Sequence, residues 1–403
     1  MSDRDPTPGE IAAYIERLTR RLSLDGALTG ARWREALSDV PRHLFVPDVA
    51  WASPGGSEPP YLVNRKASPA AWWDAVYSDT VLITQYDDGA SDLASGGKRP
   101  TSSNSAPSLV VEFLESLSVQ DGNRVLEVGT GTGWTAGLLS SRLGPDNVAT
   151  IEIDRTLAAQ AAENLKAAGY VPHLVVGDGE TGLPDAAPYD RVHITCSVTR
   201  IPYAWVEQTR PGGIIVVPCI NEFSDGDGHL TRLEVSGDGT ATGRFPHAAS
   251  FMMLRRQRYD PRPLGSYLHH EDDADRTRTT IDPRTIGQAG YGAELGIGAK
   301  VPGCQARLRE ADDGSGEATY WLIETDRGRG AGSWAVVEYV PGHDTYAVDQ
   351  YGARRLWDEV TGAYQWWRDA GEPGRDRYGV TVTPQGQHIW LDSADNVIGP
   401  QTR

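Results

Sequence analysis

Long apolar runs are missing from this sequence of 403 residues, and so is an excess of positive charge. No stretch of about 18 consecutive apolar residues occurs, which argues against a membrane-spanning helix. The 38 Lys and Arg residues are outnumbered by 55 Asp and Glu residues, giving a formal net charge of −17. Nucleic-acid binding usually needs a basic face, and an anionic membrane repels an acidic chain. We therefore expect neither kind of partner.

Cysteine is also scarce. Cys196, Cys219 and Cys304 lie far apart and form no Cys-x-x-Cys pair, a pattern typical of free, buried thiols in a reducing compartment. The cluster His269–Asp273 offers metal-ligand side chains, but adjacent residues on one loop rarely converge on one ion. The first residues are polar and then helical in pattern, without the apolar core of a signal peptide. We expect a cytoplasmic protein without a bound metal.

What the sequence does contain is a glycine-rich segment between two apolar runs. Val125–Val128 is typical of a buried parallel strand. Gly129–Gly133 follows as Gly-Thr-Gly-Thr-Gly, then a helical pattern over Ala136–Leu143 and a second strand over Val148–Ile153. Glycines permit a sharp turn and a close approach of the backbone to a ligand. Strand, turn, helix and strand together predict the first half of a nucleotide-binding βαβ unit.

Two acidic residues indicate which nucleotide this unit binds. Glu152 lies near the end of the second strand, about 20 residues past the glycines, where a carboxylate accepts hydrogen bonds from ribose hydroxyls. Glu127 lies two residues before Gly129, and a carboxylate there favours a positively charged ligand without phosphates. S-adenosylmethionine, with an ammonium and a sulfonium, fits this requirement. The pattern Glu-x-Gly-x-Gly-x-Gly resembles the class I methyltransferase signature, which we favour over a nicotinamide-dependent enzyme.

Further segments resemble the protein L-isoaspartate O-methyltransferase family. They follow in the family's order between about Pro41 and Leu254: Pro41–Pro47 (PRHLFVP), Tyr77–Asp79 before an apolar strand, Thr101–Ser108, and Pro188–Thr195. Taken alone, the first of these segments could equally be a strand bounded by prolines. In the family, a Thr-x-Ser-x-Pro-type segment places a hydroxyl beside the methyl-accepting carboxylate. Here the preceding Gly-Gln is absent, and several serines are present.

The resemblance implies the catalytic candidates Ser103, Ser105 and Asp79, without deciding between the two serines. The serines could also cap the helix that follows them. In class I methyltransferases an acidic residue after the third strand meets the adenine amino group, and Asp178 matches that position. His193 lies within a strand, and we expect it to be a buried core residue rather than a catalytic one. The implied cofactor-binding residues are Glu127, Gly129, Thr130, Gly131, Gly133, Trp134, Glu152, Ile153, Gly177, Asp178, Gly179 and Thr195.

These observations predict an α/β fold with two domains. The first, over residues 1–255, would be a class I S-adenosylmethionine-dependent methyltransferase (Rossmann-like) domain with N-terminal helices. Residues 256–280 would form a linker, and 281–403 a smaller α+β C-terminal domain for peptide recognition. Its aromatic side chains should be mostly core, although some could line a peptide-binding surface. Residues 48–71 and 87–100 are predicted to be an irregular loop and a flexible lid or disordered insert.

The implied chemistry is methyl transfer to a carboxylate, which is already ionised at pH 7 and needs only proximity and orientation. In the resembled family the ester then acts as a leaving group, giving a succinimide that hydrolyses to aspartate or isoaspartate. C-terminally extended members occur with ribosomal peptides such as lanthipeptides and ATP-grasp-made macrocycles (graspetides). We therefore favour methylation of an aspartate in a constrained, macrocyclic ribosomal peptide, ending in aspartimide or isoaspartate, with S-adenosylhomocysteine as the cofactor product. The alternative is general isoaspartate repair. Two further alternatives rank lower: a small-molecule methyltransferase and a non-catalytic S-adenosylmethionine-binding partner. The sequence predicts no particular oligomeric state.

Overall fold

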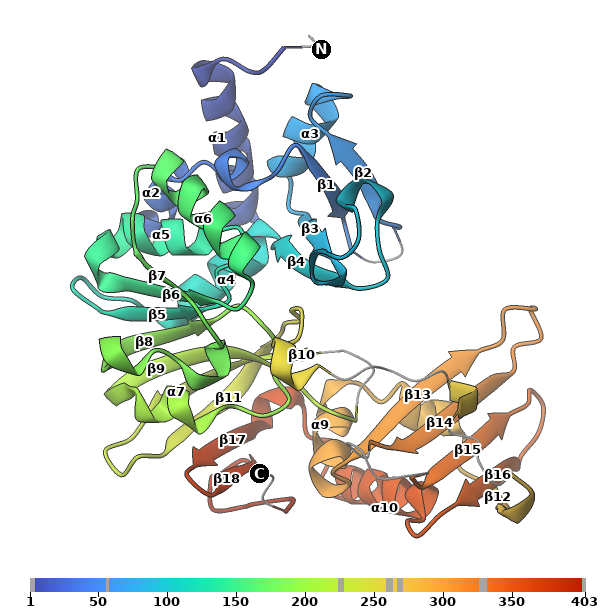
Figure 1. Ribbon diagram of the computed structural model, residues 1–403. Coiled ribbons are helices and arrows are strands. Elements are labelled where there is room, and N and C mark those ends of the chain that lie inside the picture. The colour runs from blue at the N-terminus through green and yellow to red at the C-terminus, as the bar shows by residue number, and fades with distance from the viewer. Residues whose placement is uncertain are drawn as a thin grey trace.

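Three β-sheets organise the chain in the computed structural model, which describes residues 4–55, 58–223, 228–258, 264–266, 271–325 and 332–400 (Figure 1). The largest sheet has nine strands. In spatial order they are β18 (Gly386–Leu391), β17 (Tyr378–Thr383), β11 (Ala241–Ala248), β10 (Gly228–Val235), β9 (Thr209–Ile220), β8 (Tyr189–Ile194), β5 (Val125–Val128), β6 (Val148–Glu152) and β7 (His173–Val176).

The middle of this sheet is parallel and covered on both faces. β7, β6, β5, β8 and β9 run parallel, and every residue of β5, β6 and β8 is buried. Parallel strands buried on both faces are usually rich in apolar residues, and these strands also bury polar side chains such as Glu127, Thr150 and His193. Val125 packs in one core with α4 (Pro107–Leu117) and α5 (Trp134–Leu143), whereas Leu126 and Val128 pack in another with α7 (Tyr203–Glu207). Helix α6 (Arg155–Ala167) packs on β6 and β7. The predicted Rossmann-like fold is confirmed.

A four-stranded antiparallel sheet stands above the large one, beside the N-terminal helices (Figure 1). Its order is β2 (Tyr61–Asn64), β1 (Val49–Ser53), β3 (Val81–Tyr86) and β4 (Pro100–Asn104), and the helices are α1 (Pro8–Leu24), α2 (Ala31–Asp39) and α3 (Pro69–Val76). The irregular loop predicted over residues 48–71 is therefore wrong. The strands there are short, and β1 is held by pairing with β3, which lies far along the chain.

The segment 87–100, predicted to be a lid or an insert, is an ordered loop joining β3 to β4. It contains the short 3₁₀ helices η2 (Asp87–Gly89) and η3 (Leu93–Ser95). The carboxylate of Asp87 closes it by accepting hydrogen bonds from the backbone N–H groups of Lys98 and Arg99, both at 3.0 Å. A polar sequence thus forms a defined turn because one carboxylate satisfies its backbone donors.

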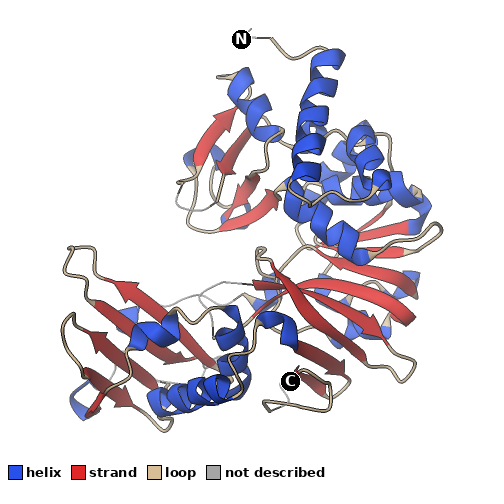
Figure 2. Cartoon of the chain, turned by 180° about the vertical axis from the view of Figure 1, so that it is seen from behind, coloured by secondary structure: helices blue, strands red, loops and turns tan. Residues whose placement is uncertain are grey.

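The third sheet has five antiparallel strands and lies beside the large one (Figure 2). Its order is β12 (Asp275–Thr279), β16 (Tyr346–Tyr351), β15 (Trp334–Tyr339), β14 (Ala318–Glu324) and β13 (Cys304–Glu310), and it packs with α8 (Pro283–Gly287), α9 (Tyr291–Lys300) and α10 (Leu356–Asp369). Aromatic residues such as Tyr320, Trp357 and Trp367 are buried in its core, as the sequence predicts.

The C-terminal boundaries differ from the prediction at both ends. β12 lies within the predicted linker 256–280, yet it pairs with β16 along its whole length. β17 and β18 lie within the predicted domain 281–403, yet β17 pairs with β11 of the large sheet. Tyr378 and Val380 are buried in that sheet's core. An alternating apolar pattern predicts a strand but carries no information about which sheet the strand joins.

Several composition-based expectations can be compared with the described residues. Cys196, Cys219 and Cys304 are all free, as expected. No helix in the described ranges is both long and apolar enough to cross a membrane. In those same ranges, no group of three His, Cys, Asp or Glu residues is placed to hold a metal ion. His269 and His270, weighed above as metal ligands, lie outside the described residues.

Candidate active site

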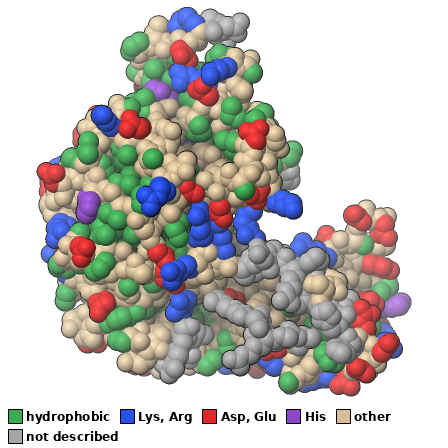
Figure 3. All heavy atoms as spheres, viewed as in Figure 1, with side chains coloured by type: hydrophobic (Ala, Val, Ile, Leu, Met, Phe, Trp, Pro, Cys, Tyr) green, Lys and Arg blue, Asp and Glu red, His purple; other side chains and the backbone are tan. Residues whose placement is uncertain are grey.

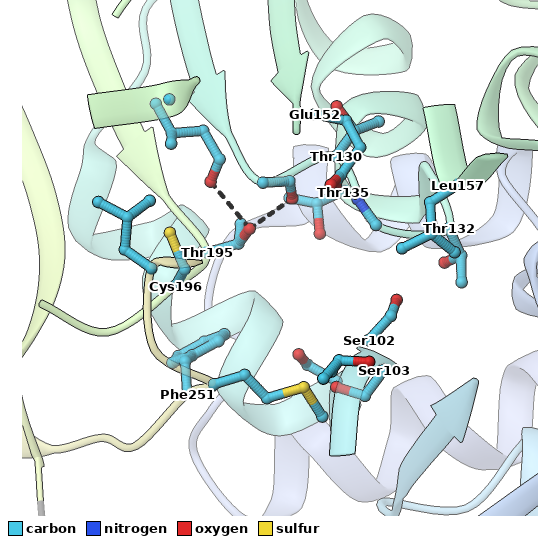
Figure 4. A pocket seen from close by; sticks show the side chains of 18 of the residues that line it. Ser102, Ser103, Thr130, Thr132, Thr135, Glu152, Leu157, Thr195, Cys196 and Phe251 are labelled. Carbon is cyan, nitrogen blue, oxygen red and sulfur yellow. Dashed lines mark hydrogen bonds between the residues drawn. The ribbon is translucent and has the colours of Figure 1, made fainter. Parts of the chain in front are cut away.

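A cavity of about 230 Å³ opens where β5, β6 and β8 end, between the glycine loop and β4 (Figure 4). In open α/β sheets the crevice at the carboxyl ends of the strands is the usual ligand site. One wall follows the large sheet through residues 128–132, 134–135, 151–153 and 195–196. The opposite wall consists of residues 101–105 and the first turns of α4. The cavity thus lies between the segment predicted to bind the cofactor and the segment predicted to meet the substrate.

The glycine loop needs its glycines for two different reasons. Gly129, Gly131 and Gly133 all have positive φ angles, of 94°, 55° and 93°, which disfavour other residues. A Cβ on Gly129 would come within 2.5 Å of the Thr195 hydroxyl oxygen, which is committed to the carbonyls of Val128 and Gly129. A Cβ on Gly131 would instead meet nothing closer than 3.8 Å and would project toward β4. Gly131 therefore leaves the gap between the two walls open.

Glu152 lies in the cavity wall and holds the loop. It is 7% exposed, and burial raises its pKa. One carboxylate oxygen accepts from the N–H of Gly131 and the other from the N–H of Asp154, both at 2.9 Å. Each oxygen keeps a lone pair that could accept a further hydrogen bond from a ligand.

Glu127 lies beneath the loop and is not part of the cavity wall. It is fully buried and accepts a hydrogen bond from the Thr150 hydroxyl at 2.6 Å, and Thr150 lies 2.6 Å from the Thr130 hydroxyl. Burial raises the pKa of Glu127 to about 8. It therefore acts on the loop through two threonines rather than by direct contact with a ligand's ammonium group.

The other residues predicted to bind the cofactor also fall into two groups, those in the cavity wall and those behind it. The cavity wall includes Gly129, Thr130, Gly131, Trp134, Glu152, Ile153, Asp178, Gly179 and Thr195. Gly133 and Gly177 stand behind it, where a Cβ would press on Leu165 and Ile151, each 3.2 Å away. Asp178 accepts from the N–H of Glu180 at 3.0 Å and forms an ion pair with Arg256.

On the opposite wall, Ser103 and Ser105 both line the cavity. Within the described part of the chain, neither hydroxyl has a hydrogen-bond partner. The alternative that the serines cap α4 is wrong, because no side chain at its N-cap position makes a capping bond. Asp79 fills this role instead, accepting from the N–H of Ser108 at 2.8 Å. Asp79 is exposed and does not line the cavity, so the structure does not bring it together with the serines.

A segment after β11 crosses the cavity mouth, which the sequence did not predict. β11 ends at Ala248. Residues 250–255 line the cavity, and Met252 and Leu254 hydrogen-bond through their backbones to Ser197, at 2.9 and 2.8 Å. Residues 250–258 are called the strap below. The backbone N–H and C=O groups of Ser197, shortly after β8, hold the strap in this position, and no sequence motif predicts this pairing.

Arginines tie the strap to three surrounding elements. Arg255 reaches Asp88 at 2.9 Å and Asp154 at 3.3 Å, Arg258 reaches Asp88 at 2.7 Å, and Arg256 pairs with Asp178. Lys and Arg side chains also gather near the middle of the face drawn in Figure 3, below the four-stranded sheet. The cavity mouth therefore carries positive groups in a chain of net charge −17.

His193 is buried, as expected, but it also borders the cavity. It is 2% exposed, packs edge-on to Phe113, and burial lowers its pKa to about 4. The ring is therefore neutral at pH 7. Cys196 also lines the cavity, and burial raises the pKa of its thiol, so it stays protonated. Neither side chain is poised as a charged catalytic group.

The comparisons with known proteins agree with this geometry. The family model for protein-L-isoaspartate(D-aspartate) O-methyltransferase matches residues 63–258. A protein-L-isoaspartate O-methyltransferase of Ignicoccus hospitalis is 35% identical over 207 residues, covering 51% of this chain and 81% of the relative. One of Methanopyrus kandleri is 33% identical over 245 residues, covering 59% of this chain and 90% of the relative.

A solved protein-L-isoaspartate O-methyltransferase has a similar fold. It is 22% identical, has a TM-score of 0.52, and the match spans 94% of this chain and 100% of that chain. The family model ends at residue 258, whereas a match of this span extends into the C-terminal sheet. The structural match therefore continues beyond residue 258.

Proposed function

The chain belongs to the protein L-isoaspartate O-methyltransferase family, and from this premise we propose that it methylates the free carboxylate of isoaspartyl residues in proteins and peptides. It is an S-adenosylmethionine-dependent O-methyltransferase. From sequence alone, this general reaction was the alternative to methylation of an aspartate in a constrained ribosomal peptide. The comparisons favour the general reaction, because the relatives of known name are isoaspartate O-methyltransferases.

The residues around the cavity fit the cofactor. Gly131 leaves space that a Cβ would fill, and Glu152 offers two oxygens, each with a lone pair free for ribose hydroxyls. Asp178 follows β7 at the position proposed to meet the adenine amino group. When bound, S-adenosylmethionine supplies the methyl group from its sulfonium. The single observation that carries the proposal is that these residues face the unpartnered hydroxyls of Ser103 and Ser105 across one cavity.

The chain's own contribution to the reaction is orientation. A carboxylate is ionised at pH 7, so no group has to remove a proton before it attacks. The serine hydroxyls can donate hydrogen bonds to the acceptor carboxylate and hold one oxygen toward the glycine loop. The strap lines the same cavity through residues 250–255 and is held in place by the ion pairs of Arg255 and Arg258 with Asp88. Proximity and alignment of this kind supply most of what a displacement at a methyl group requires.

The experiment is mass spectrometry of the purified protein with S-adenosylmethionine and two linear peptides that differ only in carrying isoaspartate or aspartate. We expect one added methyl group, or the succinimide derived from it, on the isoaspartyl peptide alone. Excess S-adenosylhomocysteine should suppress the reaction and serves as the control. Methylation of neither peptide by a protein that binds the cofactor would contradict the proposal.

A second candidate is the finer function, methylation of a normal aspartate in a constrained ribosomal peptide. It is supported by the five-stranded sheet, which lies beyond the matched residues 63–258 and could hold a folded peptide. The same assay separates the two, with a macrocyclic peptide carrying aspartate as a third substrate. Methylation of the macrocyclic peptide without methylation of the linear isoaspartyl peptide would favour this second function.

A further inference from the structure

The two walls of the cavity belong to different sheets, and the side chain of Asn104 forms a hydrogen bond between them; Arg42 also lies over the ring of Trp134, 5.2 Å from its centroid. β4 carries Ser103, is followed directly by Ser105, and among the described residues pairs only with β3. The glycine loop belongs to the nine-stranded sheet. Asn104, at the end of β4, donates a hydrogen bond from its side-chain nitrogen to the hydroxyl of Thr132 in the glycine loop, at 3.1 Å. Within the described residues, this is the only hydrogen bond between β4 and that loop.

The other end of the same carboxamide is held by a buried cation. Arg42, in the 3₁₀ helix η1 (Arg42–Phe45), donates from Nε to the side-chain oxygen of Asn104 at 2.7 Å. Arg42 and Asn104 are 1% and 2% exposed, and Thr132 is 8% exposed. An Asn side chain with its oxygen and nitrogen both engaged in a buried setting has one orientation, because rotating it would place donor against donor.

Arg42 itself is anchored almost entirely by backbone carbonyls. Its guanidinium donates to the carbonyl oxygens of Asn104 and Ser105 on the serine side, at 3.1 and 2.8 Å. It also donates to the carbonyls of Val76, Ser78 and Thr80, at 2.8, 3.2 and 2.9 Å. Burial lowers the pKa of Arg42 to about 9, which still leaves it charged at neutral pH. The cation thus fixes the backbone carbonyls of Asn104 and Ser105.

From these contacts we propose that Asn104 is a positioning residue that sets the separation between the serine wall and the cofactor wall. Ser103 precedes it in β4 and Ser105 follows it directly after the strand, so any shift of Asn104 moves both hydroxyls together. Thr132 lies between Gly131 and Gly133, so the same bond fixes the loop that faces them. The inference rests on the proposed function only in taking β4 as the substrate side of the cavity.

A positioning residue of this kind affects the rate of methyl transfer more than it affects the binding of either ligand. In-line transfer needs the reacting atoms about 3–3.5 Å apart and aligned, and a misplacement of about 1 Å can cost roughly 100-fold. Either wall can still bind its own ligand when the link is cut. Loss of the link should therefore lower kcat while leaving the affinity for the cofactor product nearly unchanged.

The test is a double-mutant cycle with Asn104→Ala and Thr132→Val, each assayed for methylation of the isoaspartyl peptide and for S-adenosylhomocysteine binding by calorimetry. We expect kcat to fall about 10- to 100-fold in each single variant, with Kd changed less than about threefold. The double variant should be no slower than Asn104→Ala, because Asn104→Ala already removes the bond that Thr132→Val cuts, together with the bond from Arg42. Thr132→Ser keeps the hydroxyl and should restore most of the rate.

Asn123→Ala is the matched control for a merely structural effect. Asn123 is also buried, at 6% exposed, and accepts a hydrogen bond from the N–H of Gln120 at 2.9 Å, before β5 and away from the cavity. Its loss should lower the melting temperature without lowering kcat. Multiplicative effects in the cycle, a Thr132→Val rate within twofold of wild type, or a Kd that weakens in step with kcat would each overturn the proposal.

A second measurement does not depend on the substrate. Hydrogen exchange of the backbone amides of residues 101–104 reports how firmly β4 is held. Thr132→Val should accelerate this exchange about tenfold or more, whereas Thr132→Ser and Asn123→Ala should not. If the wild-type protein methylates no isoaspartyl peptide, the proposed function fails, but this measurement still decides whether the link exists. Unchanged exchange in Thr132→Val would overturn it.

Discussion

The carboxylate of Glu152 accepts a hydrogen bond from the backbone N–H of Gly131 at 2.9 Å, so the residue proposed to bind ribose also shapes the loop beside it. Glu152→Ala should weaken binding of S-adenosylhomocysteine by roughly 1–3 kcal/mol, the range for a buried hydrogen-bonded carboxylate. Glu152→Gln, which keeps one acceptor oxygen, should lose less. Isothermal calorimetry measures both, and an affinity unchanged in Glu152→Ala would remove this residue from the cofactor site.

Asp79 was a catalytic candidate from sequence, and its position argues for a structural role. Its carboxylate caps α4 through the N–H of Ser108 and does not border the cavity. Asp79→Ala should cost about 1 kcal/mol of stability, as for other lost helix caps. We expect kcat to remain close to that of wild type at a temperature where both are folded. A large fall in kcat without a lower melting temperature would restore Asp79 to the catalytic set.

The two serines can be separated by single substitutions. Both hydroxyls are without a partner in the described structure, and a hydrogen bond to a charged acceptor is worth about 1.5–3 kcal/mol. Ser103→Ala or Ser105→Ala, whichever removes the bond to the acceptor carboxylate, should lower kcat about 10- to 100-fold. Cofactor binding should not change. Ser108→Ala is the control, because Ser108 lies outside the cavity wall and bonds to Asp79 through its backbone N–H. Wild-type rates in both variants would exclude the serines from the reaction.

Burial of Glu127 predicts how stability depends on pH. Its pKa is raised from 4.5 to about 8, so between these values the folded protein holds a proton that the unfolded chain releases. The free energy of unfolding should therefore decrease as pH rises from about 5 to 8, by at most on the order of 4 kcal/mol from this residue.

Glu127→Gln removes this titration and should flatten the pH dependence. At pH 8 the variant should melt at a higher temperature than wild type, because it buries no charge. Melting curves in the absence of cofactor, recorded from pH 5 to 8, make the comparison. Two pH profiles that run parallel would mean that Glu127 is ionised in the folded protein throughout this range.

Sequence predicted the parts of the site that depend on local chain geometry. Gly129–Gly133 sits between a strand and a helix, and positive φ angles there follow from the turn alone. Glu152 and Asp178 follow from their places at strand ends. Asn104 and Arg42 were missed because they act between segments 62 residues apart, through hydrogen bonds that no local pattern encodes. The strap was missed for the same reason.

The boundary of the C-terminal domain shows the same limit. β17 and β18 pair with each other, but the pairing of β17 with β11 of the large sheet depends on how the chain returns after α10. Residues 281–403 therefore do not form one unit, and we propose that the accessory domain consists of β12–β16 with α8–α10. This division can be tested with two closely matched substitutions.

Val380→Ala and Val348→Ala each shorten a buried valine, 1% and 0% exposed, in β17 and β16 respectively. Each should cost roughly 2 kcal/mol from lost apolar burial and an unfilled cavity. Because Val380 packs in the core of the large sheet, Val380→Ala should lower the melting transition that S-adenosylhomocysteine raises. Val348 packs in the core of the five-stranded sheet, so Val348→Ala should lower a transition that the ligand does not shift. Scanning calorimetry with and without ligand distinguishes the two. If Val380→Ala instead destabilised the transition that does not respond to ligand, β17 would belong with the accessory domain, as the sequence alone suggested.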